Sequence, residues 1–256
     1  MYKVGIDIGS TSAKVVAMDE KNDIIYTSVL PTGWSSLETA VMISENLEKK
    51  GLVKENSNVV ATGYGRISVP YADKTVTEIT CHGKGAAYLF DAENTTVIDI
   101  GGQDTKVITL AKGNVVDFIM NDKCSAGTGR FLEIMANTLG LGLNDMCELA
   151  RQGRDVSISS MCTVFAESEV IGLIGSGREK KDIAFGVIDS IANKVKSLCS
   201  KHTSGNAKIY LTGGLCENSY IIEMLSHKLE SEVISNPMGR YAGAVGAAIM
   251  AGKIIK

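Results

Sequence analysis

Apolar runs and polar turns follow one another in the same order twice along the chain. An apolar strand is predicted over Lys3–Ile8 and again over Thr95–Ile100, and each is followed by a glycine-containing turn and two further strands. The polar linkers at 19–23 and 111–114 have lengths suited to antiparallel hairpins. Each half of the chain is therefore predicted to begin with a three-stranded antiparallel meander.

Residue identities support this duplication. The segment Ile6–Gly9 reads Ile-Asp-Ile-Gly and recurs as Ile98–Gly101, and at the same offset Lys14 recurs as Lys106. Self-similarity at a fixed offset is the signature of a repeated structural unit. The two halves of the chain are therefore predicted to share one local fold.

Further strands and helices follow each meander. The apolar runs Val59–Gly63 and Ile209–Gly213 both end in Thr-Gly, which predicts a second pair of equivalent strands. Apolar residues recur at helical spacing in the segments Ser36–Lys50, Gly129–Leu139, Ile183–Cys199, Ser219–Leu229 and about Gly239–Ile255. Together these elements predict a mixed sheet covered by helices, made twice, with a boundary near residues 91–94.

Composition narrows the class of protein. A chain of 256 residues with 45% hydrophobic and 21% charged residues can bury a full core and is long enough for two domains. The net charge is −3 and no Lys/Arg run exceeds two residues, so we expect no nucleic-acid partner. The longest apolar stretch, Ala242–Gly252, is far shorter than the roughly 20 residues of a membrane span, and the first residues resemble no signal peptide. We expect a cytoplasmic protein without a membrane segment.

The two glycine-containing turns are candidate phosphate-binding sites. Each follows an aspartate near the end of a strand, and small residues leave the backbone N–H groups of a turn accessible to phosphate oxygens. Two such turns facing each other across a cleft could clamp the β- and γ-phosphates of a nucleotide. The candidate binding residues are Gly9, Ser10, Thr11, Ser12, Lys14, Gly101, Gly102, Gln103 and Asp104. Lys14 is included for its place beside the first turn, although Lys14 and Lys106 are expected to be solvent-facing strand residues without a catalytic role.

The aspartates are assigned different tasks. We expect Asp7 to hold hydrated Mg²⁺ and Asp99 to orient the attacking water, with Gln103 positioning that water or touching the γ-phosphate. The alternative is that each Asp-x-Gly is an ordinary strand terminus and turn. Its occurrence at both equivalent positions favours a functional site.

Five motifs resemble the superfamily that contains actin, sugar kinases and heat-shock chaperone ATPases. They are the two phosphate motifs Gly5–Thr11 and Asp99–Gly102, the adenosine motif Leu211–Gly214, and the hinge motifs Ala126–Gly129 and Gly243–Ala247. The resemblance implies an α/β fold of two tandem ribonuclease H-like (actin/hexokinase-type) domains, with mixed sheets covered by helices and a nucleotide cleft between them. It implies ATP or ADP with Mg²⁺ as ligands. The additional nucleotide-contacting residues it implies are Gly127, Gly129, Thr212, Gly213 and Gly214.

The same resemblance suggests domain boundaries. Residues 1–93 would form an N-terminal domain completed by the C-terminal helix 239–256, and residues 94–238 would form the C-terminal domain. Small residues in the hinge motifs would let two helices slide, although they are equally typical of tight helix packing.

Longer motifs narrow the resemblance to one family. Ala61–Arg66, Val97–Asp104, Met120–Phe131 and Cys162–Val170 resemble the activator ATPases of 2-hydroxyacyl-CoA dehydratases, which are related to the ATPase subunits of benzoyl-CoA reductases. The resemblance covers almost the whole chain. It implies an ATP hydrolase that takes one electron from ferredoxin or flavodoxin and delivers it to a dehydratase or a related CoA-ester reductase.

The cysteines alone leave metal binding and plain burial open, because Cys81, Cys124, Cys147, Cys162, Cys199 and Cys216 contain no Cys-x-x-Cys pair. The family resemblance implies one 4Fe–4S cluster per homodimer, held by Cys124 and Cys162 of both subunits. The helix after Cys124 is expected to point free N–H groups at the cluster. The other four cysteines and the Cys81-His82 pair are interpreted as structural.

Other functions remain possible from sequence. The partner could be a benzoyl-CoA reductase or a double-cubane cluster protein, and the acyl-CoA is not identified. A small-molecule kinase for amino sugars would share the phosphate motifs but would not need the cysteines. A chaperone-like or filament-forming ATPase would likewise need neither cysteine.

Overall fold

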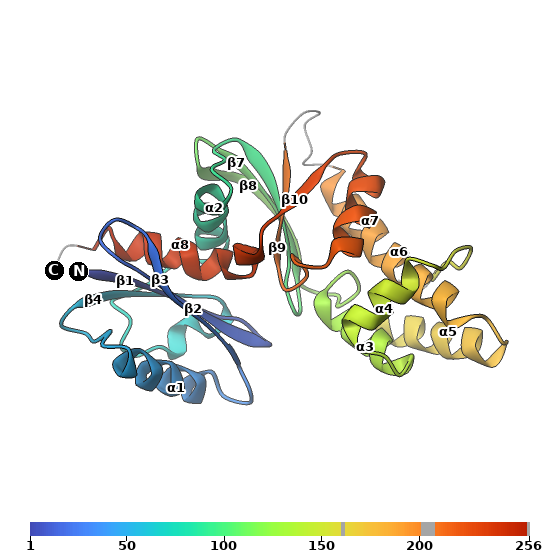
Figure 1. The fold of residues 1–256 in the computed structure, drawn as a ribbon, viewed down its shortest axis with the longest axis horizontal. Helices are drawn as coiled ribbons and strands as arrows, with labels where there is room; N and C mark the ends of the chain where they lie inside the picture. Colours follow the sequence, from blue (N-terminus) through green and yellow to red (C-terminus); the bar gives the residue numbers. More distant parts are fainter. Residues whose placement is uncertain (160–161, 201–207, 255–256) are drawn as a thin grey trace. The chain divides into compact units, whose positions relative to one another are not determined.

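The first sheet contains the meander that the sequence predicted. In the computed structural model, which describes residues 1–159, 162–200 and 208–254, β1 (Tyr2–Ile8), β2 (Ser12–Met18) and β3 (Ile24–Pro31) pair antiparallel. Strands β4 (Ser57–Thr62) and β5 (Lys74–Thr75) add in parallel, giving the order β3-β2-β1-β4-β5 (Figure 1). The predicted antiparallel meander of the first half is confirmed.

Helix α1 (Ser36–Lys49) packs on this sheet through one apolar face. Its N-cap residue Ser35 accepts a hydrogen bond at Oγ from the backbone N–H of Glu38, which satisfies one of the unpaired donors at the helix start. Its buried residues recur at helical spacing and join the core formed by β1, β2 and β4, whose members include Ala40, Ile43, Leu47, Ile6, Ile8 and Val15. The 3-10 helix Tyr64–Ser68 follows β4.

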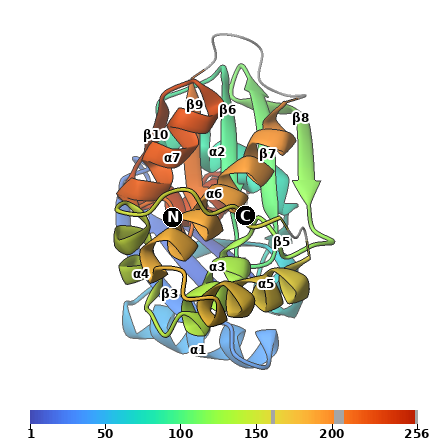
Figure 2. The same cartoon turned by 90° about the vertical axis from the view of Figure 1, so that its right-hand side faces the viewer.

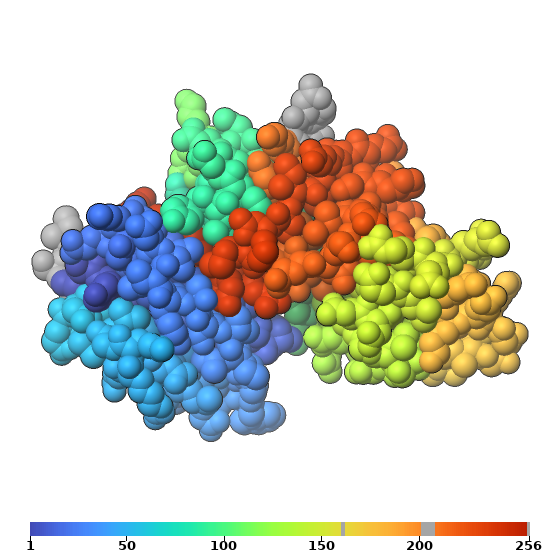
Figure 3. Space-filling view, viewed as in Figure 1, coloured from blue at the N-terminus to red at the C-terminus, as the bar shows by residue number. Residues whose placement is uncertain are grey.

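Helices α2 (Glu78–Leu89) and α8 (Ala242–Ala251) pack together, and α8 also packs on β1. A Cβ atom at Gly5 would lie 1.9 Å from the carbonyl oxygen of Ala244, and one at Gly85 would lie 1.8 Å from that of Ala242. Backbones at this separation leave no room for a side chain, which explains why α8 consists so largely of glycine and alanine. Figure 3 shows the red residues of α8 emerging between the blue strands and the teal α2.

The second sheet has the same arrangement as the first. It contains β6 (Thr95–Ile100), β7 (Thr105–Ala111), β8 (Asn114–Asn121), β9 (Ile209–Gly213) and β10 (Val233–Ser235), in the order β10-β9-β6-β7-β8. Strand β9 pairs in parallel with β6 and with β10. The predicted fold class, a helix-covered mixed sheet made twice, is confirmed.

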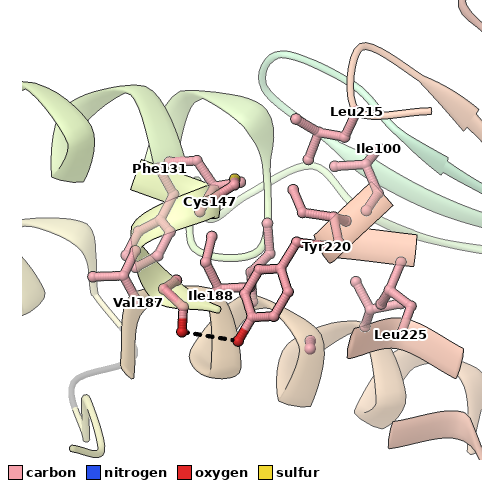
Figure 4. Packing of buried hydrophobic residues seen from close by; sticks show 14 of the residues in the cluster. Ile100, Phe131, Cys147, Val187, Ile188, Leu215, Tyr220 and Leu225 are labelled. Carbon is pink, nitrogen blue, oxygen red and sulfur yellow. Dashed lines mark hydrogen bonds between the residues drawn. The ribbon is translucent and has the colours of Figure 1, made fainter. Parts of the chain in front are cut away.

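Among the described residues, the helices that accompany the second sheet (Figure 2) are α3 (Gly129–Thr138), α4 (Leu143–Ala150), α5 (Thr163–Gly175), α6 (Lys180–Cys199) and α7 (Ser219–Leu229). Buried apolar residues from each of these helices meet in one core with Ile98 and Ile100 of β6. Figure 4 shows part of this core, where the hydroxyl of Tyr220 donates a 3.2 Å hydrogen bond to the carbonyl oxygen of Ala150. Burial of this shared core fixes the helices relative to β6.

The chain divides into two compact units. Unit 1 contains Met1–Asn94, Ile108–Asp117 and Met238–Lys256, and unit 2 contains Thr95–Val107 and Phe118–Pro237. The predicted bounds differ at Ile108–Asp117, which they assign to the second domain. This hairpin tip is attached to α2, because Lys84 Nζ donates hydrogen bonds of 2.7 Å to Gly113 O and 2.8 Å to Asn114 Oδ1.

Among the described residues, no helix combines the length and the apolar character needed to cross a bilayer.

Candidate nucleotide and cysteine sites

The first glycine-containing turn is closed by its own backbone and held by β3. Gly9 N–H donates to Ser12 O at 3.2 Å, and the residue after β3, Thr32, donates from Oγ1 to Gly9 O at 2.7 Å and from N–H to Thr11 O at 3.1 Å. Ser10 and Ser12 are half-buried, and Thr11 is exposed. The turn is therefore fixed from one side while part of it faces solvent.

Asp7 has an unsatisfied carboxylate oxygen. The side chain is 5% exposed, and its buried Oδ1 has no hydrogen-bond partner among the described residues. Glycines bring the backbone against the carboxylate, because a Cβ atom at Gly63 would lie 2.4 Å from Oδ1 and one at Gly243 would lie 2.3 Å from Oδ2. A buried carboxylate oxygen is costly without a partner, and a hydrated Mg²⁺ would supply one. The residues present therefore fit the predicted magnesium site.

The second turn repeats the geometry of the first. Gly101 N–H donates to Asp104 O at 2.9 Å, which is the same bond that Gly9 makes with Ser12. A Cβ atom at Gly101 would lie 2.5 Å from Asp104 Oδ1, so no other residue type fits there unchanged. Gly102 is half-buried and Gln103 is exposed.

Lys106 contradicts the sequence prediction. It was expected to face solvent, but it is 1% exposed and is among the largest fully buried side chains of the protein. Its Nζ lies 2.6 Å from Asp104 Oδ1 and 3.5 Å from Asp99 Oδ2. The prediction was wrong because two carboxylates surround the ammonium and compensate for its burial. Lys14, the equivalent residue, is only half-buried, and its Nζ donates to Ser12 O at 3.3 Å.

The predicted adenosine motif, Leu211–Gly214, lies at the end of β9. Gly213 has a φ of +91°, and a Cβ atom there would lie 2.3 Å from Ile100 O, so this position requires glycine. Thr212 Oγ1 donates a 2.9 Å hydrogen bond to Asp99 Oδ1. At Gly214, by contrast, a Cβ atom would meet nothing within 4 Å. Open space beside a backbone turn is what the approach of a nucleobase requires.

Helix α3 begins directly against the second turn. Gly129 N–H donates to Gly101 O and Arg130 N–H donates to Gly102 O, both at 2.9 Å. The hydroxyl of Thr105, at the start of β7, donates to Gly127 O in the loop before the helix. Two hydrogen bonds thus join the turn to the start of α3, and a third joins the adjacent Thr105 to the loop between Cys124 and α3.

This attachment corrects the predicted environment of Cys124. Helix α3 has Thr128 as its N-cap, and its first two N–H groups are used by the second turn rather than directed at Cys124. Cys124 instead lies in the preceding loop, where Asn121 Nδ2 donates 2.9 Å hydrogen bonds to Cys124 O and Ala126 O. The cysteine at a helix start is Cys162, which is the N-cap of α5.

Cys124 and Cys162 differ from the other cysteines in exposure and lie in adjoining segments. Cys162 is exposed and Cys124 half-buried, whereas the remaining four are buried. The residues that follow them, Ser125 and Thr163, share a 2.7 Å hydrogen bond between their hydroxyls. The donor set of two surface-reaching thiols in neighbouring segments therefore fits the implied iron–sulfur cluster.

Buried cysteines are less suited to metal ligation than the more exposed Cys124 and Cys162. Burial raises the pKa of Cys81 and of Cys199 to about 12 and that of Cys147 to about 11. Metal ligation requires the thiolate, so burial disfavours ligation at these positions. This supports the structural interpretation of Cys81.

The chain is similar over nearly its whole length to known dehydratase activators. Over 257 residues, the chain is 42% identical to the (R)-2-hydroxyglutaryl-CoA dehydratase activating ATPase of Acidaminococcus fermentans, covering 99% of this chain and 98% of that one. The activator of the 2-hydroxyisocaproyl-CoA dehydratase from Clostridium difficile, solved with bound ADPNP, superimposes with a TM-score of 0.90 at 37% identity, covering 99% of this chain and 95% of that one. A ROK family glucokinase from Streptomyces griseus, with a TM-score of 0.64 at 14% identity over 99% of this chain and 100% of that one, shares the fold alone.

The family match extends over nearly the whole length of the chain, from residue 4 to residue 251. It includes both phosphate turns, both surface-reaching cysteines and the Thr212–Gly214 turn. The chain belongs to the BadF/BadG/BcrA/BcrD ATPase family.

Proposed function

We propose that this protein hydrolyses ATP to control the transfer of one electron from an external reductant, ferredoxin or flavodoxin, to a 2-hydroxyacyl-CoA dehydratase. The names of its relatives support the dehydratase as partner. The observation that carries the proposal is a set of hydrogen bonds beside Cys124. The Gly101–Asp104 turn is bonded to the start of α3, and the adjacent Thr105 is bonded to Gly127 in the loop between Cys124 and α3.

The phosphate turns supply the nucleotide chemistry. Backbone N–H groups of Gly9–Ser12 and of Gly101–Asp104 bind phosphate oxygens, and the Thr212–Gly214 turn accepts the adenosine. The carboxylate of Asp7, whose buried Oδ1 has no hydrogen-bond partner among the described residues, binds Mg²⁺ through water. Asp99 orients the attacking water, and the exposed Gln103 contacts that water or the γ-phosphate.

The electron carrier is held by cysteines of two copies. Cys124 and Cys162 supply two thiolates per chain, and a homodimer supplies the four that a 4Fe–4S cluster needs. When bound, such a cluster accepts and releases a single electron at low potential. Cys162 at the start of α5 has helix N–H groups beside it, which favour negative charge on sulfur.

The surface of α5 supports dimer formation. Its apolar side chains Val164, Phe165, Ile171 and Ile174 are exposed by 66%, 67%, 56% and 44%. Large apolar side chains gathered on one exposed helix mark a surface that a partner covers. Because this helix begins at Cys162, we assign that partner to a second copy of the chain.

The hydrogen bonds of the second turn then connect nucleotide state to cysteine position. A change of the Gly101–Asp104 turn on hydrolysis acts directly on Gly129, Arg130 and Gly127, because each is bonded to the turn or to its flanking residue Thr105. A ligand shifts such an equilibrium by binding the two conformations unequally. ATP and ADP would thus present the cysteine loop differently to the dehydratase.

Activation of a dehydratase tests the proposal. Anaerobically purified protein is incubated with reduced ferredoxin, Mg-ATP and each of several inactive 2-hydroxyacyl-CoA dehydratases, and dehydration is measured. We expect activation that requires ATP and is lost in Cys124→Ser but kept in the buried-cysteine control Cys199→Ala. Activation by Cys124→Ser at the wild-type rate would contradict the proposal. Activation of a benzoyl-CoA reductase or a double-cubane cluster protein alone would redirect it to that partner.

A further inference from the structure

The buried lysine of the second phosphate turn has two acidic partners in unit 2. Asp104 directly precedes β7, and Lys106 is the second residue of that strand. Its ammonium lies 2.6 Å from Asp104 Oδ1 and 3.5 Å from Asp99 Oδ2. Thr212 Oγ1 donates to the other oxygen of Asp99. Each oxygen of Asp99 is therefore fixed by a donor from a neighbouring strand.

The first turn shows what the same scaffold does without these charges. Lys14 lies two residues after Ser12 on β2, and it contacts the backbone oxygen of Ser12 rather than a carboxylate. It stays half-buried, and Oδ1 of Asp7 has no hydrogen-bond partner among the described residues. Ser12 and Asp104 occupy equivalent positions in turns closed by the same backbone bond. The carboxylate at 104 therefore accounts for the burial of the lysine in the second turn.

Three buried charged side chains, Asp99, Asp104 and Lys106, are not explained by a gain in stability alone. Desolvation of an ammonium and two carboxylates offsets most of their mutual attraction, and apolar residues of similar volume often stabilise a core as well or better. Asp99, Asp104 and Lys106 are nevertheless 2%, 4% and 1% exposed. The three charged side chains instead fix one another's orientation, because charge-assisted hydrogen bonds have specific geometry.

We propose that Lys106 is a positioning residue for ATP hydrolysis. It holds the Asp104 side chain, and with it the closed Gly101–Asp104 turn, and it sets the orientation of the Asp99 carboxylate toward the attacking water. Lys106 itself does not touch the nucleotide. The proposal rests on the proposed function, because it assigns the residue a role in the hydrolysis step of the same site.

The first test compares kinetic constants. Lys106→Met keeps a long buried side chain but removes the charge, and we expect kcat for ATP hydrolysis to fall about 10- to 100-fold while KM for ATP changes less than about threefold. Lys14→Met, in the first turn, is expected to raise KM instead, and Lys49→Met, which makes the same chemical change on the exposed surface of α1, should leave both constants unchanged. A wild-type kcat in folded Lys106→Met would overturn the proposal.

A second variant separates positioning from stability. Asp104→Asn combined with Lys106→Met removes one charge of each sign, so we expect it to recover part of the thermal stability that the single variant loses. The kcat should stay low, because the Asp99 carboxylate still lacks the contact with the Lys106 ammonium. If the double variant recovered kcat together with stability, the ion pair would be purely structural and the proposal would fail.

Hydrogen exchange gives a readout that does not depend on hydrolysis. In nucleotide-free protein, Lys106→Met should speed amide exchange of peptides covering residues 99–107 but leave residues 7–15 unchanged. Unchanged exchange in the second turn would overturn the positioning role even if the wild-type protein hydrolysed no ATP. If the wild-type protein hydrolysed no ATP but Lys106→Met still sped amide exchange in residues 99–107, the proposed function would be refuted. The role of Lys106 in holding the Gly101–Asp104 turn would remain supported.

Discussion

Asp7 and Asp99 occupy the same position in their respective sheets but have different partners. Strand pairing places Asp7 opposite Thr62 and Asp99 opposite Thr212. The hydroxyl of Thr212 donates to Asp99, whereas that of Thr62 donates to Val76 O at 2.9 Å. One aspartate is therefore held on both oxygens, and the other keeps a buried oxygen for a ligand.

This difference predicts distinct effects of removing either charge. Asp7→Asn should raise the Mg²⁺ concentration needed for half-maximal ATP hydrolysis, because it removes the negative charge that we assign to binding the hydrated ion. Asp99→Asn should lower kcat about 100-fold with an unchanged Mg²⁺ requirement, because it removes the group that orients water. Magnesium titrations of the ATPase rate distinguish the two, and a shifted Mg²⁺ requirement in Asp99→Asn alone would reverse the assignments.

The Thr-Gly strand ends predict where the fold tolerates no side chain. Gly63 and Gly213 have φ values of +82° and +91°, and a Cβ atom would lie 2.5 Å from Ile8 O and 2.3 Å from Ile100 O. Alanine at either position should lower the free energy of unfolding by about 2 kcal/mol or more, since backbone strain adds to the clash. Gly140→Ala, at φ +65° with nothing within 4 Å, should cost only about 1 kcal/mol. Urea unfolding measures the free energy of unfolding of each variant. Equal losses at Gly140 and at Gly63 or Gly213 would contradict the close packing described at the two strand ends.

Substitution of Gly214 tests whether the Thr212–Gly214 turn binds adenosine, without disturbing the fold. Because a Cβ atom there meets nothing within 4 Å, Gly214→Ala should unfold at the wild-type temperature. If an adenine ring approaches this backbone, KM for ATP should rise several-fold with kcat retained. A variant with wild-type KM would mean that the nucleobase binds elsewhere.

Thr105 tests the connection between the second turn and the cysteine loop. Thr105→Val keeps the shape of the buried side chain but removes the hydroxyl that donates to Gly127 O. We expect ATP hydrolysis within a few-fold of wild type but a larger loss of ATP-dependent dehydratase activation. Parallel losses in both assays would instead indicate general damage to the turn.

The buried thiols predict a loss of stability at alkaline pH. Burial raises the folded-state pKa of Cys81, Cys147 and Cys199 from 9.0 to about 12, 11 and 12. The unfolded chain releases these protons first, so their contribution is fully present below pH 9 and is lost as pH rises from 9 toward 12. Urea unfolding at pH 8 and pH 10 should show this decrease, and Cys199→Ala should reduce it. If Cys199→Ala lost the same amount of stability between pH 8 and pH 10 as the wild type, the loss would come from other groups.

Much of the fold could be predicted because the same pattern of apolar and polar positions occurs in both halves of the chain. Strand β6 and helix α7 have the predicted bounds, Thr95–Ile100 and Ser219–Leu229. Helix α5 was not identified, because its apolar residues surround the helix instead of forming one face. Its exposed side chains make sense only beside a second surface, which a single sequence does not display.

The candidate site was predictable in its residues but not in its contacts. Asp104 directly precedes β7 and Lys106 is the second residue of that strand, and this i, i+2 spacing was the signal available for the buried pair. Its third member, Asp99, comes from another strand, so the burial of Lys106 depends on a tertiary contact. The Ser125–Thr163 hydrogen bond between the cysteine segments likewise joins residues far apart in sequence.

Iron content and subunit number, measured on one anaerobically purified sample, test whether two chains share one iron–sulfur cluster. We expect a dimer in analytical ultracentrifugation with about four iron and four sulfide ions per two chains, and loss of iron and sulfide in Cys124→Ser and in Cys162→Ser. A monomer with no stoichiometric iron that still activates a dehydratase in the presence of ATP would contradict a shared cluster.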